Sequence, residues 1–400
     1  MEWKLKDLTV DGKGSYGIGA PAVPYQEDKL TYLRITDIND DGSLNFSDLK
    51  SVDAEDAEKY ILKENDIVFA RTGNSTGRSY FYEKQHGTFV YAGFLIKFSL
   101  DPNKVNPRIL KYYTHSKPYF DWVNSFDTGA TRGNINAKTY GDMEIELPSR
   151  KVQDKIVSIL SSLDRKIELN NKINADLEEM AQAIFKNWFV DFEPFKDGKF
   201  VDSELGMIPE GWKVGRLTEI ASYMNGLAMQ KFPPENDEDS LPVLKIKELG
   251  QGFCGPDSDR CSCNIKDECK VHNGDVIFSW SGTLLVDVWC GGDCGLNQHL
   301  FKVTSKEYPK WFYYYWTKHH LQEFIHIAKD KAVTMGHIKR GHLEEALVAI
   351  PDNDSMERAH ELFEPILSKM ISLRLENSRL SLLRDTLLPR LMSGELEVPE

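Results

Sequence analysis

The hydrophobic positions of the chain follow two patterns, one typical of strands and one typical of helices. Short runs rich in Ile, Val, Phe and Tyr lie between Gly, Asn, Asp or Pro, as in "DIVFA" at 66–70, "FLIKFSL" at 94–100 and "DVIFSW" at 275–280. Such runs predict β-strands. Tyr-rich stretches near 108–125 and 309–327 have helical character. Together these patterns predict compact α+β domains.

A long helix is predicted after the first set of strands. No Pro or Gly occurs from Val152 to Phe189, and apolar residues recur there at heptad spacing. These apolar residues are Ile156, Leu160, Leu163, Ile167, Leu177, Ala181 and Ile184. Asn170 and Asn174 take the intervening core positions, where a polar residue costs stability but can fix register and partner.

A second long helix is predicted at the end of the chain. Asp354 and Glu357 predict a start resembling a capping box, and Gly394 predicts the stop. Pro365 is expected to kink or delay the helix. The apolar seam is expected at Leu373, Leu380, Leu383 and Leu387.

The length of these helices predicts how they pack. About 40 helical residues span roughly 60 Å, more than either domain needs to cover itself. We therefore expect the two helices to form an antiparallel coiled coil with the globular units at opposite ends. The alternative is that each helix folds back on its own domain.

The second half of the chain repeats the first, which predicts two copies of one domain. The opening Trp3-Lys4 returns as Trp212-Lys213, and both tryptophans are expected to pack at the start of a domain. The other matches, in order, are "YLRITDI" with "VLKIKEL", "NDIVFARTG" with "GDVIFSWSG", "FLIKF" with "HLFKV", "ILKYY" with "WFYYY", "ATRGNI" with "TMGHI", and "MEIELP" with "ALVAIP". The predicted segments are a first domain at 1–150, a helix at 151–190, a linker at 191–208, a second domain at 209–351, a helix at 352–394 and a tail at 395–400.

Composition limits the possible functions. The chain has 400 residues, 41% hydrophobic and 28% charged, enough for two or three domains with cores of their own. No apolar run reaches the roughly 18 residues of a membrane span, and the opening has no signal-peptide pattern, so we expect a cytoplasmic protein without membrane contact. The net charge of −13 has the same sign as nucleic acid, so overall charge would repel it rather than attract it. Any contact with DNA must be local or shared with partners.

All six cysteines lie between Cys254 and Cys294. A cytoplasmic chain is not expected to hold them as disulfides, which leaves free thiols or a metal site. The C-x2-C spacing of common zinc sites is absent, so reduced thiols are favoured over structural zinc and no metal site is predicted.

Three segments carry a resemblance to a known family. They are "LNNKINADLEEMAQAIFKNWFVDFEPF" at 169–195, "ELGMIPEGWKVGRL" at 204–217 and "LLRDTLLPRLMSGELEV" at 382–398. With the repeat, the whole chain resembles the specificity subunit of a type I restriction-modification system, and the two helices resemble the conserved regions of that family.

The resemblance implies a function and partners. Each domain would be a target-recognition domain reading one half of a split, double-stranded DNA sequence, and the helices would set the distance between them. Two modification subunits, adenine-N6 methyltransferases that use S-adenosylmethionine, would dock on this scaffold. Motor-endonuclease subunits that use ATP and Mg would join for restriction. The chain itself would hold no cofactor and catalyse nothing.

Polar loops are the candidates for reading bases, because readout needs directional donors and acceptors that reach a groove. The loop at 70–78 follows a predicted strand, and the loop at 128–140 and its counterpart are local basic patches in an acidic chain. In the first domain, the loops at 70–78 and 128–140 supply Arg71, Thr72, Asn74, Ser75, Thr76, Arg78, Thr131, Arg132, Asn134 and Lys138. In the second domain, the corresponding loops supply Ser279, Trp280, Ser281, Thr334, Met335, His337, Lys339 and Arg340. The loops at 12–19 and 225–232 are weaker candidates. The alternative is that these are ordinary polar turns and caps.

Unlike loop residues in the two domains predict an asymmetric target. Two other classes of function stay open at this point. The acidic charge and long helices would also suit an interaction scaffold with no DNA role. Asp257, Glu268 and Lys270 loosely fit a magnesium-dependent nuclease pattern. No methyltransferase tetrapeptide resembling Asn-Pro-Pro-Tyr and no Walker motif occurs in the sequence.

Overall fold

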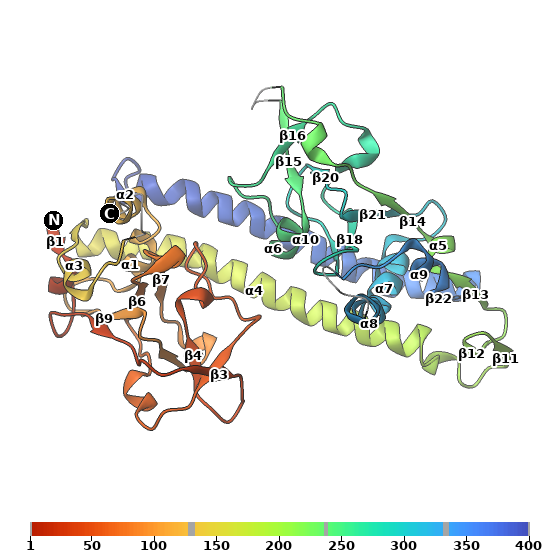
Figure 1. The fold of residues 1–400 in the computed structure, drawn as a ribbon, viewed down its shortest axis with the longest axis horizontal. Helices are drawn as coiled ribbons and strands as arrows, with labels where there is room; N and C mark the ends of the chain where they lie inside the picture. Colours follow the sequence, from red (N-terminus) through yellow and green to blue (C-terminus); the bar gives the residue numbers. More distant parts are fainter. Residues whose placement is uncertain (1, 127–132, 236–238, 331–335, 399–400) are drawn as a thin grey trace. The chain divides into compact units, whose positions relative to one another are not determined.

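The computed structural model describes residues 2–126, 133–235, 239–330 and 336–398. The chain divides into unit 1, residues 1–165 with 380–400, and unit 2, residues 166–379. Each unit contains one β-rich domain and parts of two long helices, α4 (Arg150–Phe189) and α10 (Asn353–Met392) (Figure 1). The α+β prediction is confirmed.

The domain of unit 1 is built on two four-stranded sheets. The first has the order β2 (Ser15–Tyr16), β9 (Leu95–Ser99), β6 (Asp66–Ala70), β7 (Ser79–Phe81), and all its pairs are antiparallel. The second has the order β3 (Ala22–Pro24), β5 (Lys50–Val52), β4 (Thr31–Leu33), β8 (Phe89–Tyr91), and its β4–β8 pair is parallel. A separate pair, β1 (Glu2–Lys4) with β10 (Glu144–Glu146), sets Trp3 opposite Ile145.

The domain of unit 2 repeats this plan. Its first sheet has the order β14 (Ser222–Asn225), β21 (Leu300–Thr304), β18 (Val276–Ser279), β19 (Leu285–Val288), again antiparallel. Its second has the order β16 (Arg260–Ser262), β15 (Ser240–Leu244), β20 (Cys294–Leu296), β17 (Lys270–Val271), and the β15–β20 pair is parallel. The separate pair is β13 (Lys213–Arg216) with β22 (Leu347–Ile350). The matched runs of the sequence therefore form matched strands.

The longer helices of each domain lie in the Tyr-rich stretches, and shorter helices lie in other connecting segments. Unit 1 has α1 (Arg108–Tyr113), α2 (Lys117–Asn124) and α3 (Ala137–Gly141). Unit 2 has α5 (Leu217–Ile220), α6 (Ile246–Gln251), α7 (Lys310–His319), α8 (Leu321–Asp330) and α9 (Arg340–Glu345). A hairpin of β11 (Phe200–Ser203) and β12 (Gly206–Pro209) follows α4. Trp212, just before β13, is buried against Phe189, Phe192 and Phe195, as expected for a residue at the start of a domain.

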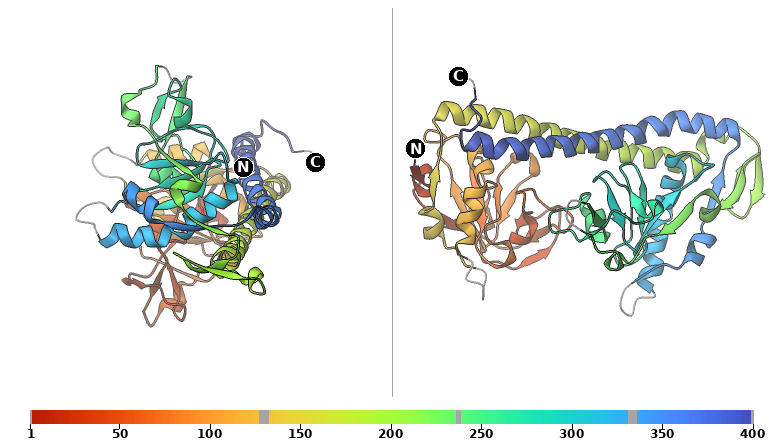
Figure 2. Two further views of the ribbon diagram at one scale, coloured as in Figure 1. Left: turned by 90° about the vertical axis from the view of Figure 1, so that its right-hand side faces the viewer. Right: turned by 90° about the horizontal axis from the view of Figure 1, so that it is seen from above.

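The two long helices lie side by side and run antiparallel in each unit (Figures 1 and 2). In unit 1, Arg384 on α10 donates from Nη1 to Oδ1 of Asp164 on α4 at 3.0 Å. In unit 2, the Asn170 amide donates to Asn377 at 2.8 Å. Asn170 is fully buried, and its Oδ1 has no partner among the described residues. A buried, half-satisfied amide on this seam fits the expected role in register.

Three details of α10 differ from the prediction. The side chain that caps the helix is Asp352 rather than Asp354, because its Oδ1 accepts from the Ser355 N–H at 2.8 Å. Pro365 does not delay the helix, because α10 begins at Asn353 and continues past the exposed proline to Met392; the proline removes one backbone donor without ending the helix.

Of the predicted apolar seam, Leu373 is buried and Leu387 packs partly buried against the core of unit 1, but the seam differs at Leu383. Leu383 is 47% exposed, whereas Leu388 and Leu391 are buried in one core with Ile156 and Leu160 of α4. The physical reason is that this end of α10 packs against the core of the domain as well as against α4, which rotates its buried stripe. Among the described residues, no helix is both long and apolar enough to cross a membrane.

Candidate DNA interface

Three predicted loops meet in unit 1. The Ile135 N–H donates to the Arg71 carbonyl at 3.0 Å, and the Thr76 hydroxyl donates to the Gly133 carbonyl at 3.2 Å, so the loop at 70–78 lies beside the described part of the loop at 128–140. The Ala137 N–H donates to the Tyr16 hydroxyl at 3.0 Å, which adds the loop at 12–19. The loop ranked as weaker is thus part of the same cluster.

Arg71 lies at the centre of this cluster. Its guanidinium carbon is 5.2 Å from the centre of the exposed Tyr16 ring, a geometry that orients the cation. The Arg71 Nε is buried and has no hydrogen-bond partner among the described residues. A buried donor left unpaired is costly, which makes Arg71 a functional candidate on physical grounds.

The other predicted residues of unit 1 differ in accessibility. Asn74, Asn134 and Lys138 are exposed, and Thr72 is half-buried. Ser75 is buried. Arg78 donates to the Asp40 carboxylate at 2.6 Å and to the Ile38 carbonyl at 3.0 Å, so the protein itself holds its guanidinium. Thr131 and Arg132 lie outside the described residues.

The corresponding loops meet in unit 2. Ser281 and His337 form an antiparallel bridge, and the Ile338 N–H donates to the Trp280 carbonyl at 3.0 Å. The Trp280 ring lies 6.4 Å from the His337 ring and 5.9 Å from the His299 ring. The Trp280 Nε1 is buried and, within the described segments, has no hydrogen-bond partner.

The remaining predicted residues of unit 2 also divide by exposure. Ser279 is fully buried and its hydroxyl donates to the Ser281 carbonyl at 3.1 Å. His337, Lys339 and Arg340 are exposed on or just before α9. Thr334 and Met335 lie outside the described residues.

Matched positions in the two units share a backbone frame but carry different side chains. Arg71 corresponds to Trp280, and the carbonyl of each accepts a backbone hydrogen bond at 3.0 Å, from Ile135 and Ile338 respectively. Both also hold a buried side-chain nitrogen without a partner among the described residues. Likewise Asn134 corresponds to His337. The frame is constant, so differences in what the units contact come from side chains.

Two glycines keep the frame closed. A Cβ on Gly17 would lie 2.2 Å from the Tyr91 carbonyl oxygen, and one on the matched Gly226 would lie 2.1 Å from that of Leu296. No side chain fits in either place, so the loops at 12–19 and 225–232 can approach the neighbouring backbone only with glycine there. This pair of matched glycines is the sequence signal for including both loops in the site.

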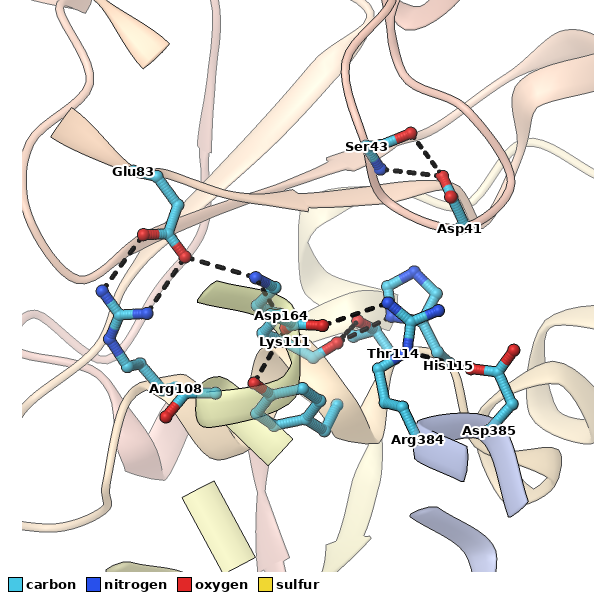
Figure 3. Close-up of polar contacts among 12 residues, drawn as sticks. Asp41, Ser43, Glu83, Arg108, Lys111, Thr114, His115, Asp164, Arg384 and Asp385 are labelled. Carbon is cyan, nitrogen blue, oxygen red and sulfur yellow. Dashed lines mark hydrogen bonds and ion pairs between the residues drawn. The ribbon is translucent and has the colours of Figure 1, made fainter. Parts of the chain in front are cut away.

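A polar network attaches the domain of unit 1 to its helices (Figure 3). Asp164 of α4 accepts from the Tyr112 hydroxyl at 2.9 Å and pairs with Lys111 at 3.1 Å and Arg384 at 3.0 Å. Glu83 pairs with Lys111 on its other side, at 3.3 Å. Burial of the Asp164 carboxyl would raise its pKa, but the charges of Lys111 and Arg384 outweigh it and hold the pKa below its usual value.

The described residues provide no catalytic constellation of the nuclease kind. Asp257 pairs with Lys247 at 2.6 Å, and Lys270 pairs with Asp267 at 2.8 Å. No group of three or more His, Cys, Asp or Glu side chains suited to a metal ion occurs in the described part of the chain, where all six cysteines are free.

The chain has two copies of one α+β domain on paired long helices. Both copies present the same loop cluster with different side chains, which is typical of a scaffold with two recognition domains. Comparison with known proteins agrees. Residues 16–179 and 209–374 match the family model described as the type I restriction modification DNA specificity domain. The chain belongs to this family and is the DNA specificity subunit of a type I restriction-modification system, which is non-catalytic within its complex.

Relatives extend this match along most of the chain. The MjaIX specificity subunit of Methanocaldococcus jannaschii is 31% identical over 307 residues, covering 73% of this chain and 69% of that protein. The HindI specificity subunit of Haemophilus influenzae is 21% identical over 404 residues, covering 84% and 88%. The crystal structure of the S subunit from M. genitalium has the same fold, with a TM-score of 0.54 at 15% identity over 100% of this chain and 96% of that one.

Proposed function

We propose that the domains at 1–150 and 209–351 each read one half of a bipartite, asymmetric duplex DNA target. The contacts in the first half come from Arg71, Thr72, Asn74, Asn134 and Lys138, and those in the second from Trp280, Ser281, His337, Lys339 and Arg340. We assign a supporting role to the other predicted residues of these loops. Ser75 and Ser279 are buried, and Arg78 forms an ion pair with Asp40. Thr76 joins two loops through its hydroxyl.

One observation carries this proposal. The same loop cluster is built twice on matched backbone hydrogen bonds, while the residues at its centre differ between the units, as with Arg71 and Trp280. A guanidinium donates hydrogen bonds and favours guanine, whereas an indole offers one donor and a broad apolar face. Two identical frames with unlike side chains suit two unlike half-sites.

The helices at 151–190 and 352–394 complete the proposal. They set the spacing of the half-sites and bind two methyltransferase subunits that modify adenine N6 with S-adenosylmethionine. Motor-endonuclease subunits that use ATP and Mg complete the restriction complex in the cytoplasm. With a net charge of −13 on this chain, the partners supply many of the phosphate contacts while the loops supply base contacts.

A domain exchange tests the proposal. Residues 1–150 are replaced by the corresponding domain of another specificity subunit, and methylated adenines are sequenced in a host that also carries the methyltransferase. We expect one half of the target to change while the other half and the spacer length stay the same. An unchanged target, or a change in both halves, would contradict the proposal.

Point variants then test the site. Lys138→Ala should lower specific methylation about tenfold, as expected for loss of one good contact. Lys84→Ala is the matched control, because it removes another exposed lysine of unit 1 that lies outside the loop cluster. Equal methylation by both variants would remove Lys138 from the interface.

A further inference from the structure

The loops that join the two sheets of each domain also belong to the proposed interface. They are residues 92–94, between β8 and β9, and residues 297–299, between β20 and β21. We propose that Phe94 contacts the methyl group of a thymine in the first half-site, and that Gln298, oriented by His299, hydrogen-bonds to a base edge in the second. This inference rests on the proposed function and names the base chemistry of that site.

Backbone hydrogen bonds fix the loop at 92–94 beside the residues already assigned. The Arg71 N–H donates to the Phe94 carbonyl at 3.1 Å. On the other side, the Gly17 N–H donates to the Leu95 carbonyl and the Ile18 N–H to the Tyr91 carbonyl, both at 3.1 Å. The loop at 92–94 is therefore held between the loops at 12–19 and 70–78.

The loop at 297–299 has the same setting in unit 2. The Trp280 N–H donates to the His299 carbonyl at 3.4 Å, and the Gly226 N–H donates to the Leu300 carbonyl at 3.1 Å. The His299 Nδ1 lies 3.1 Å from the Ser281 hydroxyl, and its Nε2 lies 3.4 Å from the Gln298 amide nitrogen. The imidazole and the amide are thus oriented together at the exposed edge of the cluster.

The side chains at these matched positions differ in kind. Phe94 is 55% exposed, although it adjoins a strand whose apolar residues are buried. Covering an exposed phenylalanine with an apolar group removes apolar surface from water, which favours binding. Thymine alone presents a methyl group in the major groove. At the matched edge the exposed Gln298 amide offers a donor and an acceptor instead, and His299 orients it.

Base analogues test the contact of Phe94 directly. In the complex with its methyltransferase, each thymine of the first half-site is replaced in turn by deoxyuridine, which lacks only the methyl group. We expect one replacement to weaken binding about three- to tenfold, as for one buried methyl, and to have no effect in Phe94→Ala. Replacements in the second half-site should give the same small changes in wild type and variant.

Two outcomes would overturn the inference: no deoxyuridine position weakens binding, or the sensitive position is equally sensitive in Phe94→Ala. Phe46→Ala is the matched control, because Phe46 is 50% exposed in the same unit but has no bond to these loops in the described structure. It should bind every duplex as the wild type does.

An exchange of side chains gives an independent test. The double variant Gly93→Gln with Phe94→His carries the last two of the three residues of the matched loop, and we expect sequencing of methylated adenines to show a changed first half-site with an intact second half. An unchanged first half-site would refute the role of this loop. If the domain exchange succeeds and this variant does not alter the target, only the present inference fails; if the domain exchange also fails, the proposed function fails.

Discussion

Asp164→Asn is the substitution that most sharply tests how the first domain is attached to its helices. The change keeps the size of the side chain and removes its charge. Asp164 is 11% exposed, and it is the shared partner of Tyr112, Lys111 and Arg384. Without the carboxylate, two partly buried cations, each 25% exposed, lose a common counter-charge.

The contacts of Asp164 set the magnitude. Removing one partner of a fully buried ion pair costs about 3–5 kcal/mol. Here the loss is smaller, because Lys111 keeps Glu83 at 3.3 Å and Arg384 keeps Asp385 at 2.9 Å. We therefore expect unit 1 to lose about 2–3 kcal/mol, close to the value of one or two hydrogen bonds to charged groups. For a unit of this size the melting temperature should fall by about 4–12 °C.

Hydrogen exchange measured by mass spectrometry on the full chain checks this value locally. Amides of α1 should exchange about 30 to 150 times faster in the variant, the ratio that corresponds to about 2–3 kcal/mol. Amides of α7, in unit 2, should be unchanged and serve as an internal reference.

Asp385→Asn is the matched control, because it makes the same chemical change on the other partner of Arg384. Asp385 is 61% exposed, and its loss should cost less than about 0.5 kcal/mol. If Asp164→Asn left α1 exchange within twofold of wild type, or if both variants behaved alike, the network would not hold the domain in place.

The buried contacts of both units lead to three further predictions. The pKa of Asp164 is lower in the folded than in the unfolded chain, so its charge stabilises unit 1 above the unfolded pKa of about 4, and this stabilisation is lost as the pH falls through the folded pKa. Urea titrations at several pH values should show the free energy of unfolding of unit 1 falling below about pH 4. The fall should be less steep in Asp164→Asn. Gly17→Ala should distort the loop cluster and abolish methylation of targets that need the first half-site, whereas Gly19→Ala, which meets open space, should not; equal activity would show that the close approach is unimportant. Trp212→Ala should lower the free energy of unfolding of unit 2 by about 3–5 kcal/mol in calorimetry. Trp3→Ala should lower that of unit 1 by less, because Trp3 is only partly buried, and equal losses would contradict this difference in burial.

Much of the candidate site could be predicted from the sequence, and the reason is visible in particular residues. The runs at 65–73 and 274–282 match each other because both form a central strand and its exit loop, so the order of residues along the chain is enough to pair Arg71 with Trp280. The same repeat pairs Phe94 with His299, but it does not show that the loop at 92–94 lies at the site. Its proximity to Arg71 depends on sheet order, since β9 lies between β2 and β6.

Local pattern by itself determined the two-fold repeat and the two long helices, because periodic apolar positions and the absence of Pro and Gly act over neighbouring residues. The tertiary structure decided which residues of those patterns are buried or engaged. Leu383 fits the heptad yet is exposed, Arg78 pairs with Asp40, and Asp164 looks like a solvated helix residue yet holds three partners. Each of these outcomes depends on a contact with a residue distant in sequence, and no local pattern of hydrophobic and polar positions encodes such a contact.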